Sequence, residues 1–187
     1  MSTQMPVTAE QLSEIAQAAG QMGVRGAQNI QVFTDTVARL GVATDLAGQD
    51  AATTLARFAN IMQMPISEAN RLGSTLVDLG NNVAASESEI ADFAMRLAGA
   101  GQVIGLSEPD VLGMSAALAA LGINAEAGGT AFSRLFVNIG NSVAKGGSAV
   151  KNFAAVAGMS ANEFTQAFRT KPAEAITRFI NGPGAMQ

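Results

Sequence analysis

Two pairs of glutamates in this sequence have the residue type and spacing for acid–base chemistry on a sugar. Glu87 and Glu89 flank Ser88, and Glu10 and Glu14 lie one helical turn apart. Glycosidases use two carboxylates, one to protonate the leaving group and one to stabilise or attack the sugar. Acidic residues are, however, favoured in the first turn of a helix by the helix dipole alone. We therefore assign no catalytic residue and expect that the chain is not an enzyme.

Glycines form the second pattern with chemical potential, because glycine-rich loops can cradle phosphate groups. A phosphate-binding loop needs a strand before it and a Lys-Ser/Thr pair after it, and Gly128-Gly129 has neither. Gly99, Gly101 and Gly105 are spaced one residue too widely for the dinucleotide-binding fingerprint. We interpret Gly128-Gly129 as a turn leading into a helix that begins near Thr130. The other three glycines are interpreted as places of close helix approach or a bend.

The amino-acid composition argues against several further kinds of functional site. The chain contains neither Cys nor His, so thiolate metal sites are excluded and the commonest metal ligand and general base are missing. We assign no metal-binding and no cofactor-binding residue. The 11 basic residues are scattered and the net charge is −4, which argues against nucleic acid sequence recognition. Charged residues make up 14% of the chain, against about 25% in typical domains, which suggests surfaces covered by other copies or by a partner.

The elements that carry these residues are predicted to be helices throughout. Apolar residues recur at helical spacing, and no comparable stretch alternates in the manner of a strand. The stripes comprise Leu12 to Met22, Ile30 to Leu40, Leu55 to Met62, Leu72 to Leu79, Ile90 to Leu97, Val111 to Leu121, Phe132 to Val143, Phe164 to Phe168 and Ile176 to Ile180. We predict an all-α fold, a compact array of about nine short helices in an orthogonal or solenoid-like arrangement. Residues 1–187 are treated as a single helical domain, with two lobes at 1–105 and 106–187 as the alternative.

Helix starts and stops are also marked in the sequence. Capping boxes, in which a hydroxyl and a residue three positions later satisfy backbone N–H groups, are predicted at Thr8-x-x-Gln11, Ser86-x-x-Glu89, Ser107-x-x-Asp110 and Ser160-x-x-Glu163, with a fainter version at Ser67-x-x-Asn70. Glycines just past the stripes are predicted to end helices in a left-handed conformation, at Gly23, Gly41, Gly80, Gly105, Gly122 and Gly158.

The order of these segments resembles the core region of bacteriophage and prophage tail tape measure proteins, which are minor tail proteins. The resemblance spans roughly residues 10 to 180, and its most specific parts are LGNNVAASESEI and ALGINAEAGGTAFSRL, followed by SVAKGG as a linker. No catalytic residue is carried over from the family. The resemblance implies a structural role in virion assembly and in determining tail length, inside the tail lumen of the virion and in the host cytoplasm during assembly. The partners that it implies are the tail tube protein, tail assembly chaperones and tail tip proteins, together with self-association.

The length of the chain indicates which part of a tape measure protein it resembles. A single helix of 187 residues would span about 280 Å at 1.5 Å per residue. Glycines and caps interrupt this chain repeatedly, so it is expected to fold into a much shorter module rather than to serve as the ruler itself. Because members of the family are much longer, we expect a fragment, truncation or prophage remnant.

Two other functions remain open at the level of sequence. A membrane-active segment that helps DNA pass through the host inner membrane is suggested by weakly charged helices rich in Gly and Ala, and it implies membrane contact during ejection. A cell-wall hydrolase is suggested by the carboxylates alone. The longest apolar stretch, Val111 to Ile123, is shorter than the about 20 residues that a membrane-spanning helix needs.

Overall fold

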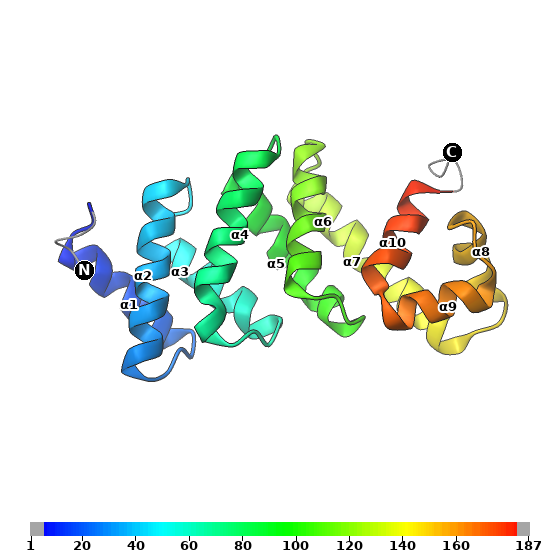
Figure 1. Cartoon of the computed structure of the whole chain (residues 1–187), viewed down its shortest axis with the longest axis horizontal. Coiled ribbons are helices and arrows are strands. Elements are labelled where there is room, and N and C mark those ends of the chain that lie inside the picture. The colour runs from blue at the N-terminus through cyan, green and yellow to red at the C-terminus, as the bar shows by residue number, and fades with distance from the viewer. Residues whose placement is uncertain (1–5, 183–187) are drawn as a thin grey trace.

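The computed structural model describes residues 6–182 and confirms the all-α prediction. The described residues contain ten α-helices, one 3₁₀ helix and no strand (Figure 1). The elements are α1 (Ala9–Gln21), α2 (Ala27–Ala43), α3 (Gly48–Ile61), η1 (Ile66–Glu68), α4 (Ala69–Asn82), α5 (Glu87–Val103), α6 (Glu108–Ala120), α7 (Ala125–Lys145), α8 (Ser148–Val156), α9 (Ala161–Thr170) and α10 (Pro172–Asn181). The sequence predicted about nine, and the helix without a predicted stripe is α8, which buries Val150 and Ala154.

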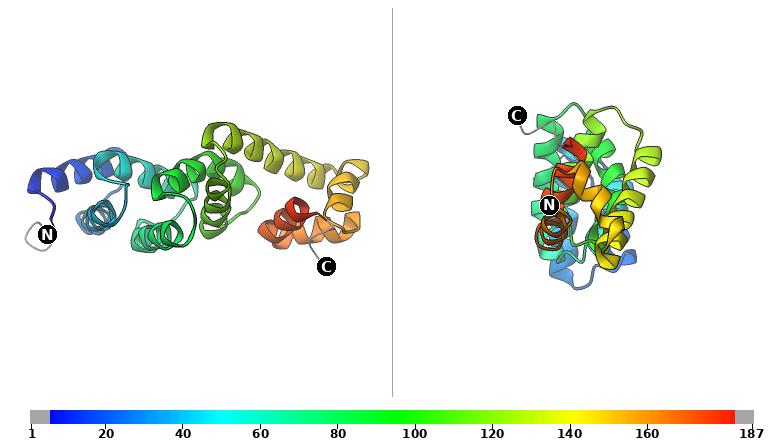
Figure 2. Two further views of the ribbon diagram at one scale, coloured as in Figure 1. Left: turned by 90° about the horizontal axis from the view of Figure 1, so that it is seen from above. Right: turned by 90° about the vertical axis from the view of Figure 1, so that its right-hand side faces the viewer.

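The helices form a solenoid-like row of two layers. Helices α1, α3, α5 and α7 pack one on the next in the first layer, while α2, α4 and α6 do so in the second. Figure 2 shows the two layers from above, with α1, α3, α5 and α7 along one side. Helices α8, α9 and α10 pack on one another and join the row through α7. The chain therefore advances along the row by helix pairs, so each helix contacts near neighbours in sequence.

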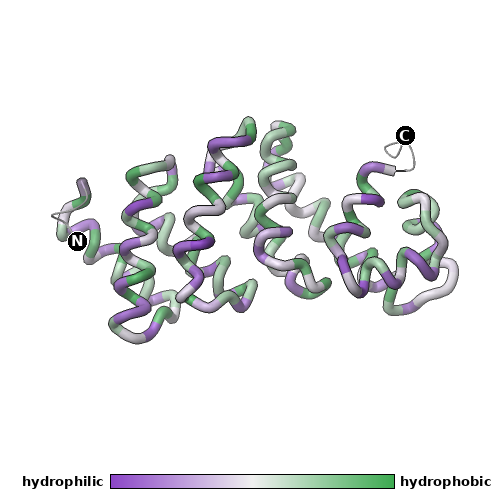
Figure 3. The backbone as a smooth tube through the Cα atoms, viewed as in Figure 1, coloured by the Kyte–Doolittle hydropathy of each residue, from purple (hydrophilic) through white to green (hydrophobic). Residues whose placement is uncertain are grey.

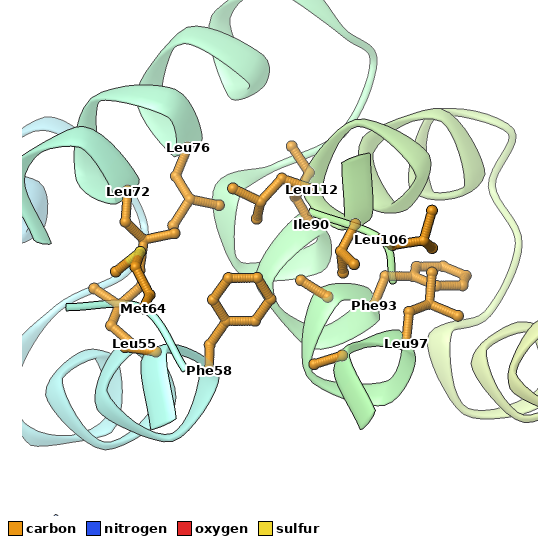
Figure 4. Close-up of a cluster of buried hydrophobic side chains, with 14 of the residues drawn as sticks. Leu55, Phe58, Met64, Leu72, Leu76, Ile90, Phe93, Leu97, Leu106 and Leu112 are labelled. Carbon is orange, nitrogen blue, oxygen red and sulfur yellow. The ribbon is translucent and has the colours of Figure 1, made fainter. Parts of the chain in front are cut away.

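The core lies between the two layers and is built from Phe, branched aliphatic residues and Ala. All nine Phe residues are buried or half-buried. Figure 4 shows part of this core, where side chains from α3, α4, α5 and α6 meet; the labelled residues are Leu55, Phe58, Met64, Leu72, Leu76, Ile90, Phe93, Leu97, Leu106 and Leu112. Hydrophobic and hydrophilic residues alternate along most helices, as Figure 3 shows, because each helix buries one face.

Helix starts follow the predicted capping boxes. All four boxes, at Thr8, Ser86, Ser107 and Ser160, have both of their hydrogen bonds. The fainter prediction at Ser67-x-x-Asn70 is wrong: α4 has no side-chain cap, and the amide oxygen of Asn70 instead accepts from the Thr36 hydroxyl on α2. Asn70 therefore joins two helices of the second layer instead of starting one.

The interpretation of Gly128-Gly129 as a turn is wrong. Gly128 and Gly129 do not form a turn; they are buried inside α7, which begins at Ala125. The side chain of Asn124 starts that helix by accepting from the N–H groups of Glu126 and Ala127. A Cβ atom at Gly128 would lie 2.5 Å from Ile123 Cγ2 and 3.0 Å from Phe93 Cζ. The glycines are needed because α7 lies close against α5.

Gly129 shows the same close approach one residue later. A Cβ atom there would lie 2.7 Å from Arg96 Cβ on α5. The neighbouring hydroxyl of Ser133 donates to the Arg96 carbonyl at 2.8 Å, so the two helices are also hydrogen-bonded. Gly101 on α5 plays an equivalent role toward α6, since its Cβ would lie 2.9 Å from Val111 Cγ2. Here the predicted close approach is confirmed.

The predicted helix stops are correct in four cases and wrong in two. Gly23, Gly105, Gly122 and Gly158 have a positive φ just past a helix. Gly41 and Gly80 lie inside α2 and α4 instead, where an added Cβ would approach Ala47 and the Glu87 side chain respectively. The predicted SVAKGG linker is also shorter than expected, because its first four residues continue α7 and Gly146-Gly147 alone makes the connection.

Polar contacts also connect segments of the row that are distant in sequence. Asp45, which follows α2, accepts from the backbone N–H of Ser88 at 3.0 Å and from its hydroxyl, at the start of α5. Burial acts to raise the pKa of Asp45, but the hydrogen bonds from Ser88 and Ser86 outweigh it and hold the pKa below its ordinary value. Arg71 on α4 pairs with Glu108 at the start of α6. Carboxylates and cations thus connect successive helix pairs at the surface.

The close approach of α7 to α5 can be tested with two alanine substitutions. Gly128→Ala is expected to lower the free energy of unfolding by about 1–3 kcal/mol, because the added methyl group overpacks the contact with Phe93. Gly99→Ala is the matched control, since nothing lies within 4 Å of a Cβ at that position on α5. It should raise stability by up to about 1 kcal/mol through higher helix propensity. Urea denaturation measures both, and a stabilising Gly128→Ala would contradict the packing described.

The Asp45 contact predicts a particular pH dependence. Since the pKa of Asp45 is lower in the folded chain, its contribution is present above the ordinary Asp pKa and is lost as the pH falls through the folded pKa. Asp45→Ala is expected to cost about 1 kcal/mol or less at neutral pH, because the carboxylate is exposed. The difference from the parent chain should shrink below about pH 4. A difference independent of pH between 7 and 3, measured by denaturation, would exclude this role.

Candidate interaction surface

The carboxylates singled out in the sequence are used mainly for helix starts. Glu89 accepts from the Ser86 N–H at 2.9 Å as part of its capping box, and Glu87 lies against Gly80 of α4. Glu10 and Glu14 are exposed on α1. Glu87 and Glu89 do not line a common cavity among those found in the described part of the chain.

One open hollow does bring two carboxylates together, though a different pair from the one predicted. Glu89 and Asp92 line a space of about 350 Å³ beside the connection between α6 and α7. Asp92 was not predicted as a site residue, although its position three residues after Glu89 places both on one face of α5. Glu89 is already bound to the Ser86 N–H in the capping box. Asp92 is the carboxylate of this hollow that takes no part in capping the helix. Within residues 6–182, no three acidic side chains gather in a way that could hold a metal ion.

The described residues contain no candidate for a membrane-spanning helix. None of their helices combines the length and the apolar character that a span across a bilayer requires. The two glycine patterns also lie where no ligand is needed to explain them, since Gly101, Gly128 and Gly129 are buried in helix contacts.

Exposed apolar side chains are the feature that packing within the chain leaves unexplained. Seven large hydrophobic residues are exposed in the described structure, and six of them lie between residues 103 and 180; the seven are Val42, Val103, Leu121, Ile123, Val137, Val156 and Ile180. Single exposed apolar residues are ordinary on any protein. Their concentration around α6, α7 and the last three helices marks that part of the chain as a candidate contact surface.

A groove of about 500 Å³ between α6 and α10 collects several of these residues. Leu121, Ile123 and Ile180 line it together with Met114, and Phe132 of α7 also contributes to the lining. Helix α6 carries no charged residue from Val111 to Ala120, which is typical of a helix covered on all sides. In this structure α4 and α5 cover one part of its surface, and the groove lies along another.

The sequence placed Leu121 and Ile180 on buried stripes, and this part of the prediction is wrong. Leu121 is 74% exposed and Ile180 is 51% exposed. Helix α6 ends at Ala120, so Leu121 is its C-cap residue and no longer follows the helical register. Ile180 lies in the last turn of α10, on the side that faces the groove. Periodicity alone could not show that no further helix covers these positions.

Comparison with known protein families identifies the chain. Residues 1–182 match the family described as phage-related minor tail protein. The chain belongs to this family. No curated protein and no solved structure matches the chain.

A phage-related minor tail protein is a structural component of the virion tail, and the matched residues include the whole described helical row. The groove between α6 and α10 and every exposed apolar residue named above lie inside the match.

Proposed function

We propose that the chain is a folded module of a phage tail tape measure protein that acts through protein–protein contacts during tail assembly. The family match supports a tail protein, and the finer assignment rests on the resemblance of LGNNVAASESEI and ALGINAEAGGTAFSRL to the tape measure core region. The proposed partners are the tail tube protein, the assembly chaperones and the tip proteins. The proposed locations are the host cytoplasm during assembly and then the tail lumen.

The shape of the helices supports a module rather than a ruler. The longest helix, α7, has 21 residues, so it extends for only about 32 Å at 1.5 Å per residue. The chain turns back after each helix and forms a row of pairs instead of one rod. We propose that length is set by extended helical segments of a longer protein, to which this row contributes contact surfaces.

The α6–α10 groove is the observation that carries this proposal. It is lined mostly by apolar side chains, and Leu121, Ile123 and Ile180 among them are exposed. Anchoring side chains of a partner that enter an apolar groove typically supply most of the binding free energy. A contact surface of this kind needs no catalytic group, so we also propose that the chain has no enzymatic activity.

Substitution in the groove provides the main test. The double variant Leu121→Asp, Ile180→Asp should fold normally by circular dichroism, because both side chains are more than half exposed. Its affinity for the purified tube, chaperone or tip protein encoded beside its gene should fall at least about tenfold, equivalent to about 1.4 kcal/mol. Titration calorimetry or biolayer interferometry measures the affinity.

Val42→Asp is the matched control for that experiment. Val42 is 53% exposed on α2, so the substitution adds one negative charge, against two in the groove variant, at a similar exposure and far along the row from the groove. It should leave affinity unchanged. The proposal fails if none of the tail proteins binds the parent chain, or if the control weakens binding as much as the groove variant does.

The absence of hydrolase activity is a separate prediction. Glu89→Gln, Asp92→Asn changes both acids that line the hollow beside the α6–α7 connection. Gln keeps the capping box because it can still accept from the Ser86 N–H. Neither the parent chain nor the variant should release soluble fragments from purified peptidoglycan. Digestion by the parent chain that the variant loses would show an enzyme and contradict the proposal.

A further inference from the structure

A second groove, on another side of α7, combines apolar and basic groups. It encloses about 540 Å³ between the end of α5, the second half of α7 and the end of α9. Val103 and Val137 line it and are 75% and 42% exposed. The backbones approach closely here, since a Cβ at Gly140 would lie 3.2 Å from Ile104 Cγ2. Arg169 of α9 also lines the groove and is exposed.

The charged residues that line this groove, and those on its α7 side, are basic. Residues 127–162 contain three basic residues and no Asp or Glu. Arg134 and Lys145 are exposed and lie three residues before and eight residues after Val137, positions that share one face of α7 with it. Arg169 adds a cation from the facing helix. None of the residues lining the groove is acidic.

Within residues 6–182, these cations have no acidic partner. Nearby Lys171 and Arg178 are both paired with Glu174, which shows how the chain neutralises cations elsewhere on this end. Among residues 6–182 no carboxylate lies within 4.0 Å of the basic groups of Arg134, Lys145 or Arg169. An apolar strip edged by unpaired cations is complementary to a surface with an apolar centre and acidic edges.

We propose that this groove docks an acidic amphipathic helix from another tail protein. The apolar face of that helix would cover Val103 and Val137, and its carboxylates would pair with Arg134, Lys145 and Arg169. The strip from Arg134 to Lys145 extends for about 16 Å, the length of about three helical turns. A protein helix is favoured over a nucleic acid because apolar side chains separate the cations, whereas nucleic acid binding relies on phosphate contacts along the strand. This inference rests on the proposed function, since it specifies a second contact surface and the chemistry of its partner.

The experiment uses the full chain and two synthetic helical peptides labelled with a fluorophore. Both peptides carry leucines at helical spacing; one has glutamates and the other has lysines at the flanking positions. Fluorescence anisotropy should show saturable binding of the glutamate peptide, weakened at high salt, and no binding of the lysine peptide. Arg169→Glu and Val137→Ser should each weaken binding of the glutamate peptide at least about fivefold.

Arg57→Glu on α3 is the matched control, because Arg57 is exposed and far along the row from the groove. It should bind the glutamate peptide as the parent chain does, which separates the groove from a general effect of net charge. Equal binding of both peptides, no binding of the glutamate peptide, or equal loss in the Arg57 variant would overturn the inference.

Two further measurements decide between occupants. Binding to phosphatidylglycerol vesicles that Arg169→Glu abolishes, without peptide binding, would assign the groove to a lipid surface and overturn the inference. Self-association in sedimentation experiments that the same substitution abolishes would assign it to a second copy, with the same consequence. Tail protein binding that depends on Leu121 and Ile180 would persist if this inference alone is wrong, so its failure is distinguishable from failure of the proposed function.

Discussion

Close contact between helix backbones at small residues is the constraint on which the whole row depends. Helix α5 contacts α3, α4, α6 and α7, and it can do so because Gly101 faces Val111 while Gly128 of α7 faces Phe93. A side chain at either glycine would separate the backbones and remove contact from the buried residues around them. The core combines large side chains, such as those of Phe and Leu, with many alanines, and glycine lets the backbones approach where the helices are closest.

The order of the helices explains why exposed apolar grooves lie at one end of the row. In the first part of the chain, successive helix pairs cover one another, and Val42 is the one large apolar residue exposed before residue 103 within the described range. After α6 the second layer does not continue in direct contact, and α8 to α10 pack mainly on one another. Helix α7 is consequently covered less completely than α5, and grooves open on two of its sides. A change of helix order, rather than a special sequence motif, creates the surfaces.

The helices could be predicted because their signals are local in sequence. The features that the sequence did not predict depend on contacts between helices. Hydroxyl caps act within four residues, so all four boxes could be identified from sequence. A glycine in a helix contact and a glycine at a helix stop look alike in one sequence, which is why Gly80 and Gly128 were assigned the wrong role. The groove was not predictable for a related reason. Leu121 and Ile180 fit an apolar stripe, and their exposure follows from which helices are absent beside them.

The two grooves beside α7 differ in a way that bears on specificity. The one between α6 and α10 contains a single acid, Asp110, which is held by its capping box. If it binds a partner as proposed, we expect it to select that partner mainly by shape and apolar area. The one beside α9 has cations at its edge and none of the acids that would neutralise them. Charge at the edge of an apolar surface affects association rate and rejects partners of the wrong sign more than it adds affinity. Because both surfaces include α7, whose position is fixed by the glycine contact with α5, their relative placement depends on the same packing that holds the row together.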